Sequence, residues 1–104
     1  MIPIKTVKEL IEKHSSLEKE LSSGQIDKKL FAEKSKEYSD VNEVINIAKK
    51  FINFENNKND LEKILEDQSS DDELKNMAEN ELLDLKSQHE INEKKLKLFL
   101  LPKD

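Results

Sequence analysis

Two histidines, His14 and His89, are the side chains of this sequence with the clearest potential for metal chemistry. A di-iron helical bundle needs Glu-x-x-His pairs, so that both ligands on one helix face the same metal ion. The residue three positions before His14 is Ile11. The corresponding residue before His89 is Lys86. His89-Glu90 begins like a zinc-protease motif, but position 93 holds glutamate where that motif needs a second histidine. The sequence therefore predicts no metal site.

Other catalytic chemistries also lack their residues. The absence of cysteine excludes disulfides, thiolate metal sites and cysteine nucleophiles. A single glycine, Gly24, cannot form a glycine-rich phosphate-binding loop. The many carboxylates lie in polar stretches, without the apolar pocket that raises a pKa for acid–base catalysis. We therefore expect no enzyme, no catalytic residue and no cofactor, with His14 as a half-buried structural residue and His89 as an ordinary surface residue.

The charge of the chain is unevenly distributed. Residues 60–84 contain ten acids and two lysines, a net charge of −8, whereas the rest of the chain carries +3. A broad basic face for nucleic acid is therefore not expected, and any such contact would be local. No apolar run approaches the roughly 18 residues of a membrane span, and no signal peptide follows Met1. These features predict a cytoplasmic protein with no membrane contact.

Apolar residues at spacings of three and four predict helices along the whole chain. The first is expected over residues 5–22, before Gly24, which suits the left-handed position after a helix. A second begins near Asp27, a good N-cap residue, with Leu30 and Phe31 on its inner side. A kink or short break is expected at residues 39–40, because Ser-Asp with glutamate at position 43 resembles another helix start. Helical spacing then continues to residue 65.

The last helix is expected over residues 72–101, after a polar loop at residues 67–72. Ser70 and Glu73 have the spacing of a capping box for its start. Two long helices joined by a short loop must lie antiparallel, and the last helix would be roughly 45 Å long. The sequence therefore predicts an all-α fold. We expect an elongated antiparallel helical hairpin with one or two shorter N-terminal helices packed on it, forming a three- or four-helix bundle.

Two surfaces are candidates for contacts with partners. Five acids crowd the expected tip of the hairpin and could contact a basic partner: Glu66, Asp67, Asp71, Asp72 and Glu73. At the other end, four consecutive apolar residues at 98–101 surround the helix, and one neighbouring helix cannot bury them all. We expect Phe99 to point inward and Leu98, Leu100 and Leu101 to form a patch for the remaining domains of a longer chain. In an isolated fragment, the same patch predicts weak self-association.

Two segments of the chain, Phe-Ala-Glu-Lys-Ser-Lys-Glu-Tyr-Ser at residues 31–39 and a second at the end of the sequence, carry a resemblance to a known family. The first is similar to an early Ser-Lys-Glu-Tyr-Ser stretch of the bacterial peptide chain release factor 1 family, a family of class I release factors. Residues 98–104, Leu-Phe-Leu-Leu-Pro-Lys-Asp, resemble the Leu-Leu-Leu-Leu-Pro-Lys-Asp that closes its N-terminal helical domain. The family also places an acidic loop between these motifs, where residues 67–72 stand. Factor 2 usually lacks the Pro-Lys-Asp ending, which favours factor 1.

The resemblance implies that residues 1–104 are the N-terminal helical domain of a release factor. Such factors read UAA and UAG on the ribosome and trigger hydrolysis of peptidyl-tRNA. Their codon-reading Pro-x-Thr loop and catalytic Gly-Gly-Gln lie in later domains, and neither tripeptide occurs here. The N-terminal domain of the family reaches toward the base of the ribosomal stalk, near ribosomal protein L11. We therefore expect an accessory docking domain that is not catalytic by itself. The alternative is a helical-bundle protein–protein interaction module unrelated to translation.

Overall fold

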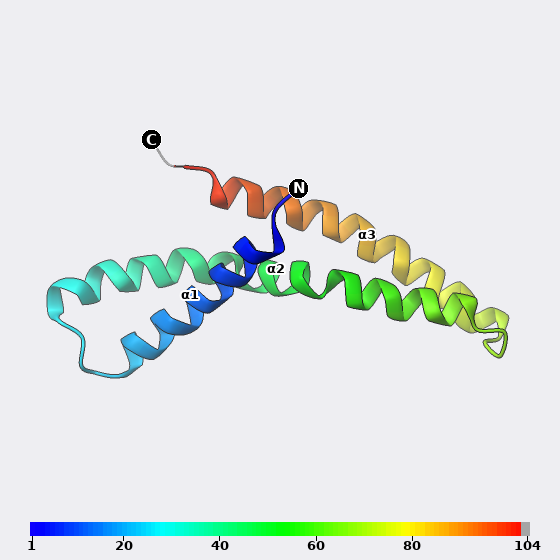
Figure 1. Ribbon diagram of the computed structural model, residues 1–104, viewed down its shortest axis with the longest axis horizontal. Coiled ribbons are helices and arrows are strands. Elements are labelled where there is room, and N and C mark those ends of the chain that lie inside the picture. Colours follow the sequence, from blue (N-terminus) through cyan, green and yellow to red (C-terminus); the bar gives the residue numbers. More distant parts are fainter. Residues whose placement is uncertain (103–104) are drawn as a thin grey trace.

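The computed structural model describes residues 1–102 and consists of three helices. These are α1 (Ile4–Ser22), α2 (Lys28–Glu66) and α3 (Asp72–Leu100) (Figure 1). No strand occurs among the described residues, so the predicted all-α class is confirmed. The molecule is elongated, with extents of 60 × 32 × 19 Å. Residues 103 and 104, the end of the Pro-Lys-Asp motif, lie outside the described residues.

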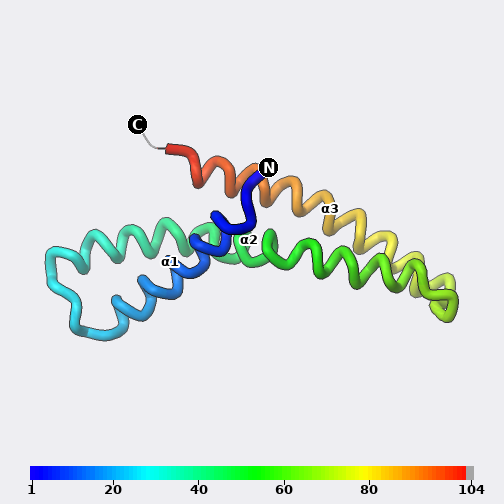
Figure 2. Tube along the Cα trace, in the orientation of Figure 1, coloured from blue at the N-terminus to red at the C-terminus, as the bar shows by residue number. Residues whose placement is uncertain are grey.

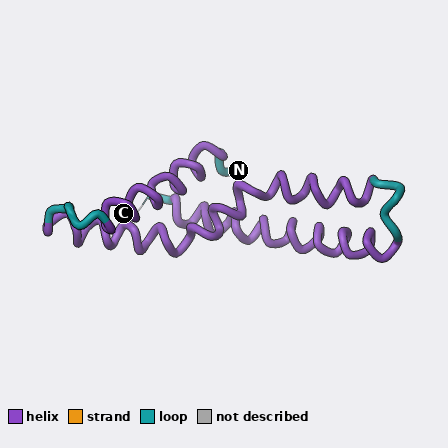
Figure 3. Tube along the Cα trace, turned by 90° about the horizontal axis from the view of Figure 1, so that it is seen from below, coloured by secondary structure: helices purple, strands orange, loops and turns teal. Residues whose placement is uncertain are grey.

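Helix α2 is the central element, because both other helices pack on it. Helix α1 runs antiparallel along the N-terminal half of α2, and α3 runs antiparallel along its C-terminal half (Figure 2). The α2–α3 pair is the predicted long hairpin, joined by the loop at residues 67–71 (Figure 3). One shorter N-terminal helix is present in place of the one or two that the sequence allowed.

The local signals at the α1–α2 connection act as the sequence predicts. Gly24 has a φ of 72°, the only positive φ among the described residues, and it follows the end of α1. Asp27 is the N-cap of α2, where its carboxylate accepts a hydrogen bond from the backbone N–H of Lys29 over 3.1 Å. This bond satisfies one of the backbone donors that a helix start leaves without a partner.

Two predicted helix starts are absent from the structure. Helix α2 continues without the predicted break through residues 39–40, where Tyr38 and Val41 pack on α1 on either side, and a kink there stays a prediction. At the start of α3 the N-cap is Asp71 and not Ser70, since the Asp71 carboxylate accepts the backbone N–H of Leu74 over 2.8 Å. The N-cap side chain bonds a donor in the first turn, and Asp71 is the residue directly before that turn.

The first turn of α2 is also more open than predicted. Leu30 and Phe31 were expected on the inner side, but their side chains are 46% and 48% exposed. Helices α1 and α2 diverge toward the loop at residues 23–27, so this turn has no helix against it (Figure 1).

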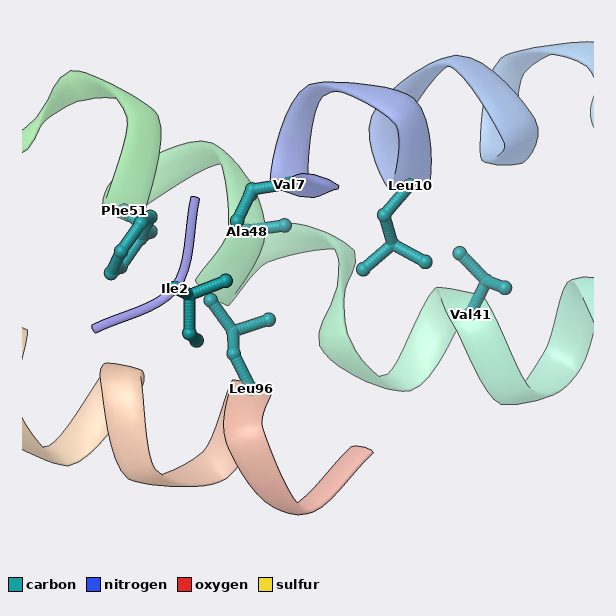
Figure 4. Packing of buried hydrophobic residues seen from close by; sticks show 7 residues of the cluster. All are labelled: Ile2, Val7, Leu10, Val41, Ala48, Phe51 and Leu96. Atoms are coloured by element: carbon teal, nitrogen blue, oxygen red, sulfur yellow. The ribbon is translucent and has the colours of Figure 1, made fainter. Parts of the chain in front are cut away.

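The main core lies where the three helices meet near the middle of α2. Its buried apolar residues come from every helix and from the segment before α1: Ile2, Val7, Leu10, Val41, Ala48, Phe51 and Leu96 (Figure 4). Ile2 points toward Leu96, so the N-terminal segment closes the space between α1 and α3 (Figure 4). Phe99 packs half-buried against this cluster, as the sequence predicts.

Candidate partner-binding surfaces

The acidic tip, defined as the five acids predicted to contact a partner, lies at the far end of the α2–α3 hairpin. All of its side chains are exposed: Glu66, Asp67, Asp71, Asp72 and Glu73. The turn that joins the helices brings all five into a segment of eight residues at the narrow end of the molecule (Figure 3). Asp72 and Glu73 also suit the first turn of α3, where the helix dipole favours negative charge.

Asp67 shapes this turn through its carboxylate. The hydroxyl of Ser69 donates a hydrogen bond to Oδ1 of Asp67 over 2.7 Å, and the backbone N–H of Ser69 donates to the same oxygen over 2.9 Å. These bonds, together with the positive charge of Lys75, hold the pKa of Asp67 below its ordinary value, although desolvation acts in the opposite direction. Two of the five tip acids, Asp67 and Asp71, therefore organise the turn that displays the others.

The lowered pKa of Asp67 predicts a pH effect on stability. The ionised carboxylate of Asp67 stabilises the turn fully when the pH lies above the pKa that Asp67 has in the unfolded chain. This stabilisation is lost as the pH falls through the lower pKa that Asp67 has in the folded chain. We expect Asp67→Asn to lose less stability than the wild type when the pH falls from about 5 to about 2. Urea unfolding across this range is the measurement, with Asp72→Asn as the control. Identical pH profiles for the wild type and Asp67→Asn would contradict this account of the turn.

The apolar end of α3 is exposed to different degrees. The side chains of Leu98 and Leu101 are 70% and 58% exposed, whereas Leu100 is 36% exposed. Phe99 between them packs on the core. The contact of these leucines with further domains stays a prediction.

His89 differs from the surface residue that the sequence suggested. Its ring stacks on Phe54 at a centroid distance of 3.7 Å and on Phe51 at 5.0 Å, with interplanar angles of 13° and 18°. Nδ1 of His89 is buried and has no hydrogen-bond partner within the described part of the chain. The prediction was wrong because it did not pair His89 with the aromatic residues of α2. His89 has helical spacing from Leu85 and Leu96, and this spacing could have placed His89 on the apolar side of α3 that packs on α2.

A groove of about 720 Å³ runs between α2 and α3 beside this aromatic stack. Its walls include the aromatic rings of Phe54 and His89 and the carboxylates of Asp60, Glu81 and Asp84. Close by, the Gln88 amide donates a hydrogen bond to Oδ1 of the buried Asn92 over 3.0 Å. The groove therefore combines apolar and acidic walls with polar side chains of α3.

His14 has the structural role that the sequence predicts. It is buried in the α1–α2 interface, where Nε2 lies 2.9 Å from Oδ1 of Asn42 and the ring stacks on Tyr38 at 4.9 Å. Within residues 1–102, no group of three or more His, Cys, Asp or Glu side chains could hold a metal ion. Among the same residues, no helix is long and apolar enough to cross a membrane.

Known proteins similar to this chain are peptide chain release factors. The chain is 69% identical over all 104 residues to peptide chain release factor 1 of Pelagibacter ubique, of which it covers 29%. It is 34% identical to the factor of Alkaliphilus oremlandii over 91% of this chain, and 38% identical to that of Agathobacter rectalis over 94%. The chain spans 27% and 28% of these two relatives. No solved structure matches it.

The match to a protein family covers most of the helical structure. Residues 10–104 match the PCRF domain, and this range includes about two thirds of α1 and the whole of α2 and α3. The factor of Pelagibacter ubique extends the similarity through the first nine residues. The chain therefore belongs to the PCRF domain family and corresponds to the N-terminal portion of peptide chain release factor 1.

Proposed function

We propose that this chain is the accessory docking domain of a cytoplasmic translation termination factor. The full factor would recognise UAA and UAG on the ribosome and direct release of the nascent peptide. The match of residues 10–104 to the PCRF domain carries this proposal, since it covers the whole α2–α3 hairpin. The docking site would lie at the base of the ribosomal stalk, near ribosomal protein L11.

The shape and charge of the hairpin support a docking role. The acidic tip is exposed at one end of a molecule 60 Å long, and the core lies near the middle of α2, away from the tip. A tip at this position can contact a partner without disturbing the core. Its negative charge would attract a basic protein surface and increase the association rate, most strongly at low ionic strength.

The chemistry of peptide release would belong to other domains of the factor. Both histidines have packing roles in the structure, since His14 faces Asn42 and His89 stacks on Phe51 and Phe54. The chain also lacks the Gly-Gly-Gln tripeptide. We infer that residues 1–104 alone do not hydrolyse peptidyl-tRNA.

A chimera tests this function. In it, the chain replaces the matching portion of the Pelagibacter ubique factor, to which it is 69% identical. We expect the chimera to release formyl-methionine from ribosomes programmed with UAA or UAG, and residues 1–104 alone to release none.

Asp71→Asn with Asp72→Asn should slow association of the chimera with ribosomes about two- to fivefold at low salt, and less at high salt. Asparagine is also a good N-cap, so the start of α3 should persist.

Glu9→Gln with Glu12→Gln is the matched control, because it neutralises two exposed acids on α1, away from the tip. Association rates of the tip variant that equal those of the chimera at every ionic strength would contradict the tip contact. A folded chimera without release activity, beside an active parent factor, would contradict the docking function and favour an interaction module unrelated to translation.

A further inference from the structure

The groove between α2 and α3 has an apolar wall to which both helices contribute. Phe54 and Leu61 come from α2, whereas Leu85 and His89 come from α3. All four side chains are half-buried. The volume of about 720 Å³ falls within the range of roughly 300 to 1,000 Å³ that is typical of ligand pockets. The groove is therefore large enough for a ligand that has apolar surface to bury.

The charged side chains of the groove are ordered along its length. Helices α2 and α3 are antiparallel and meet at the turn of residues 67–71, so Asp60, Glu81 and Asp84 all line the end of the groove nearer to this turn. Lys50 lines the opposite end, about 15 Å from Asp60 along α2. It is the only lysine or arginine among the described residues that line the groove. One end of the groove is therefore acidic and the other is basic.

The carboxylates at the acidic end are not neutralised by the chain itself. Asp60, Glu81 and Asp84 are exposed, and none of them forms an ion pair within residues 1–102. Glu81 and Asp84 are three residues apart on α3, a spacing at which like charges slightly destabilise a helix. A positive group bound between the helices would remove this repulsion. Beside an apolar wall, these carboxylates favour a ligand that combines positive charge with apolar surface.

The groove also offers hydrogen bonds that suit a peptide backbone. Asn57, Ser87, Gln88 and Asn92 line it with neutral polar side chains. Asn92 is only 3% exposed, and its Oδ1 already accepts the amide of Gln88, so its amide nitrogen is the group left to donate to a ligand. Amide and hydroxyl side chains both donate and accept hydrogen bonds. An extended peptide needs such partners, because its backbone N–H and C=O groups are not paired with each other.

We propose that this groove binds a short extended segment of a separate protein, with an arginine at the acidic end and apolar side chains against Phe54 and Leu85. A guanidinium group can bond a carboxylate through two N–H groups and also packs on aromatic rings. Lys50 disfavours a second arginine at the opposite end. Along about 15 Å of groove, four or five extended residues of about 3.3 Å each can be bound.

This proposal goes beyond ribosome docking, because the groove and the acidic tip consist of different residues. The tip acids lie in residues 66–73, whereas the groove acids lie at positions 60, 81 and 84. A loss of binding at one surface therefore leaves the other intact, and the two functions can be tested separately.

Fluorescence anisotropy with two labelled peptides tests binding to the groove. The probes are Arg-Gln-Leu-Leu-Ser with blocked ends and the same residues in reverse order, which together cover both chain directions. We expect one of them to bind with a dissociation constant of about 0.1 mM or less. Replacement of the arginine in that probe by glutamate should weaken binding at least about tenfold. The absence of binding by both probes up to about 1 mM would overturn the proposal.

Variants of the chain separate a specific site from general attraction to an acidic protein. Asp60→Asn with Asp84→Asn should weaken binding of the probe at least about fivefold. Glu9→Gln with Glu12→Gln is the matched control, because it removes the same charge from exposed positions on α1, and it should change the affinity less than about twofold. Circular dichroism of both variants checks that the helices persist. Equal weakening by the two variants would overturn the site.

Nuclear magnetic resonance of the isotope-labelled chain locates the bound peptide. The side-chain amides of Asn57, Gln88 and Asn92 report directly on the groove, and we expect their signals to shift while the backbone amides of the acidic tip keep theirs. Shifts at the tip without shifts in the groove would overturn the proposal.

The chimera with the Pelagibacter ubique factor identifies the kind of occupant. We expect it to bind the probe as tightly as residues 1–104 alone, since the groove is reserved for a separate protein. Binding that the chimera loses would assign the groove to another part of the longer chain and would overturn the proposed partner.

Discussion

Leu96→Ala is expected to lower the free energy of unfolding by about 3 kcal/mol, because it leaves a cavity in the centre of the domain. Leu96 is fully buried and belongs to the cluster that joins all three helices. Its contact with Ile2 also holds the N-terminal segment in place (Figure 4). Small domains have total stabilities of about 5–15 kcal/mol, so this loss would be a large fraction of the whole. Urea unfolding followed by circular dichroism is the measurement.

Leu98→Ala is the matched control, since it makes the same change two residues along the same helix. Leu98 is 70% exposed, and we expect a change within about 0.5 kcal/mol. Both variants should be measured under the same conditions, at micromolar concentration. Equal effects of the two substitutions would show that Leu96 is not at the centre of the core.

The second large effect is expected at His89, where the size of the side chain should matter more than its polarity. His89→Ala removes a ring stacked on Phe51 and Phe54, and we expect a loss of about 2 kcal/mol. His89→Leu keeps most of the volume and removes the unpaired Nδ1, so its stability should lie within about 1 kcal/mol of the wild type.

Thermal and urea unfolding of both variants at pH 7 measure this difference. A His89→Leu variant as unstable as His89→Ala would show that the aromatic stacking itself, and not the filled space, stabilises this part of the hairpin.

The helix boundaries could be predicted where the signal is local. Gly24 and Asp27 act through their own backbone conformation and through a hydrogen bond two residues away, so a short stretch of sequence contains all the relevant information. The helical spacing of apolar residues along α3 was also readable, because a spacing of three and four residues is a property of one helix, although His89 on the same side was missed. These local features account for the correct all-α hairpin.

Predictions failed where the outcome depended on a neighbouring helix. The start signal at residues 39–40 has no effect because Tyr38 and Val41 pack on α1, and this packing favours a continuous α2. His89 was assigned to the surface because its partners, Phe51 and Phe54, are distant in the sequence. The acidic tip was placed correctly as a turn, but what it contacts depends on a molecule outside this chain.

The arrangement of α1 and α3 on opposite halves of α2 also affects how the chain can fold. Each helix packs on the one next to it in the sequence, so the contact order is low and the search for native contacts is short. Residues 1–66 contain both partners of the first hairpin, which can therefore form during synthesis before α3 has emerged. Helix α3 then docks on a preformed surface, and the arrival of Leu96 beside Ile2 is the step that completes the core.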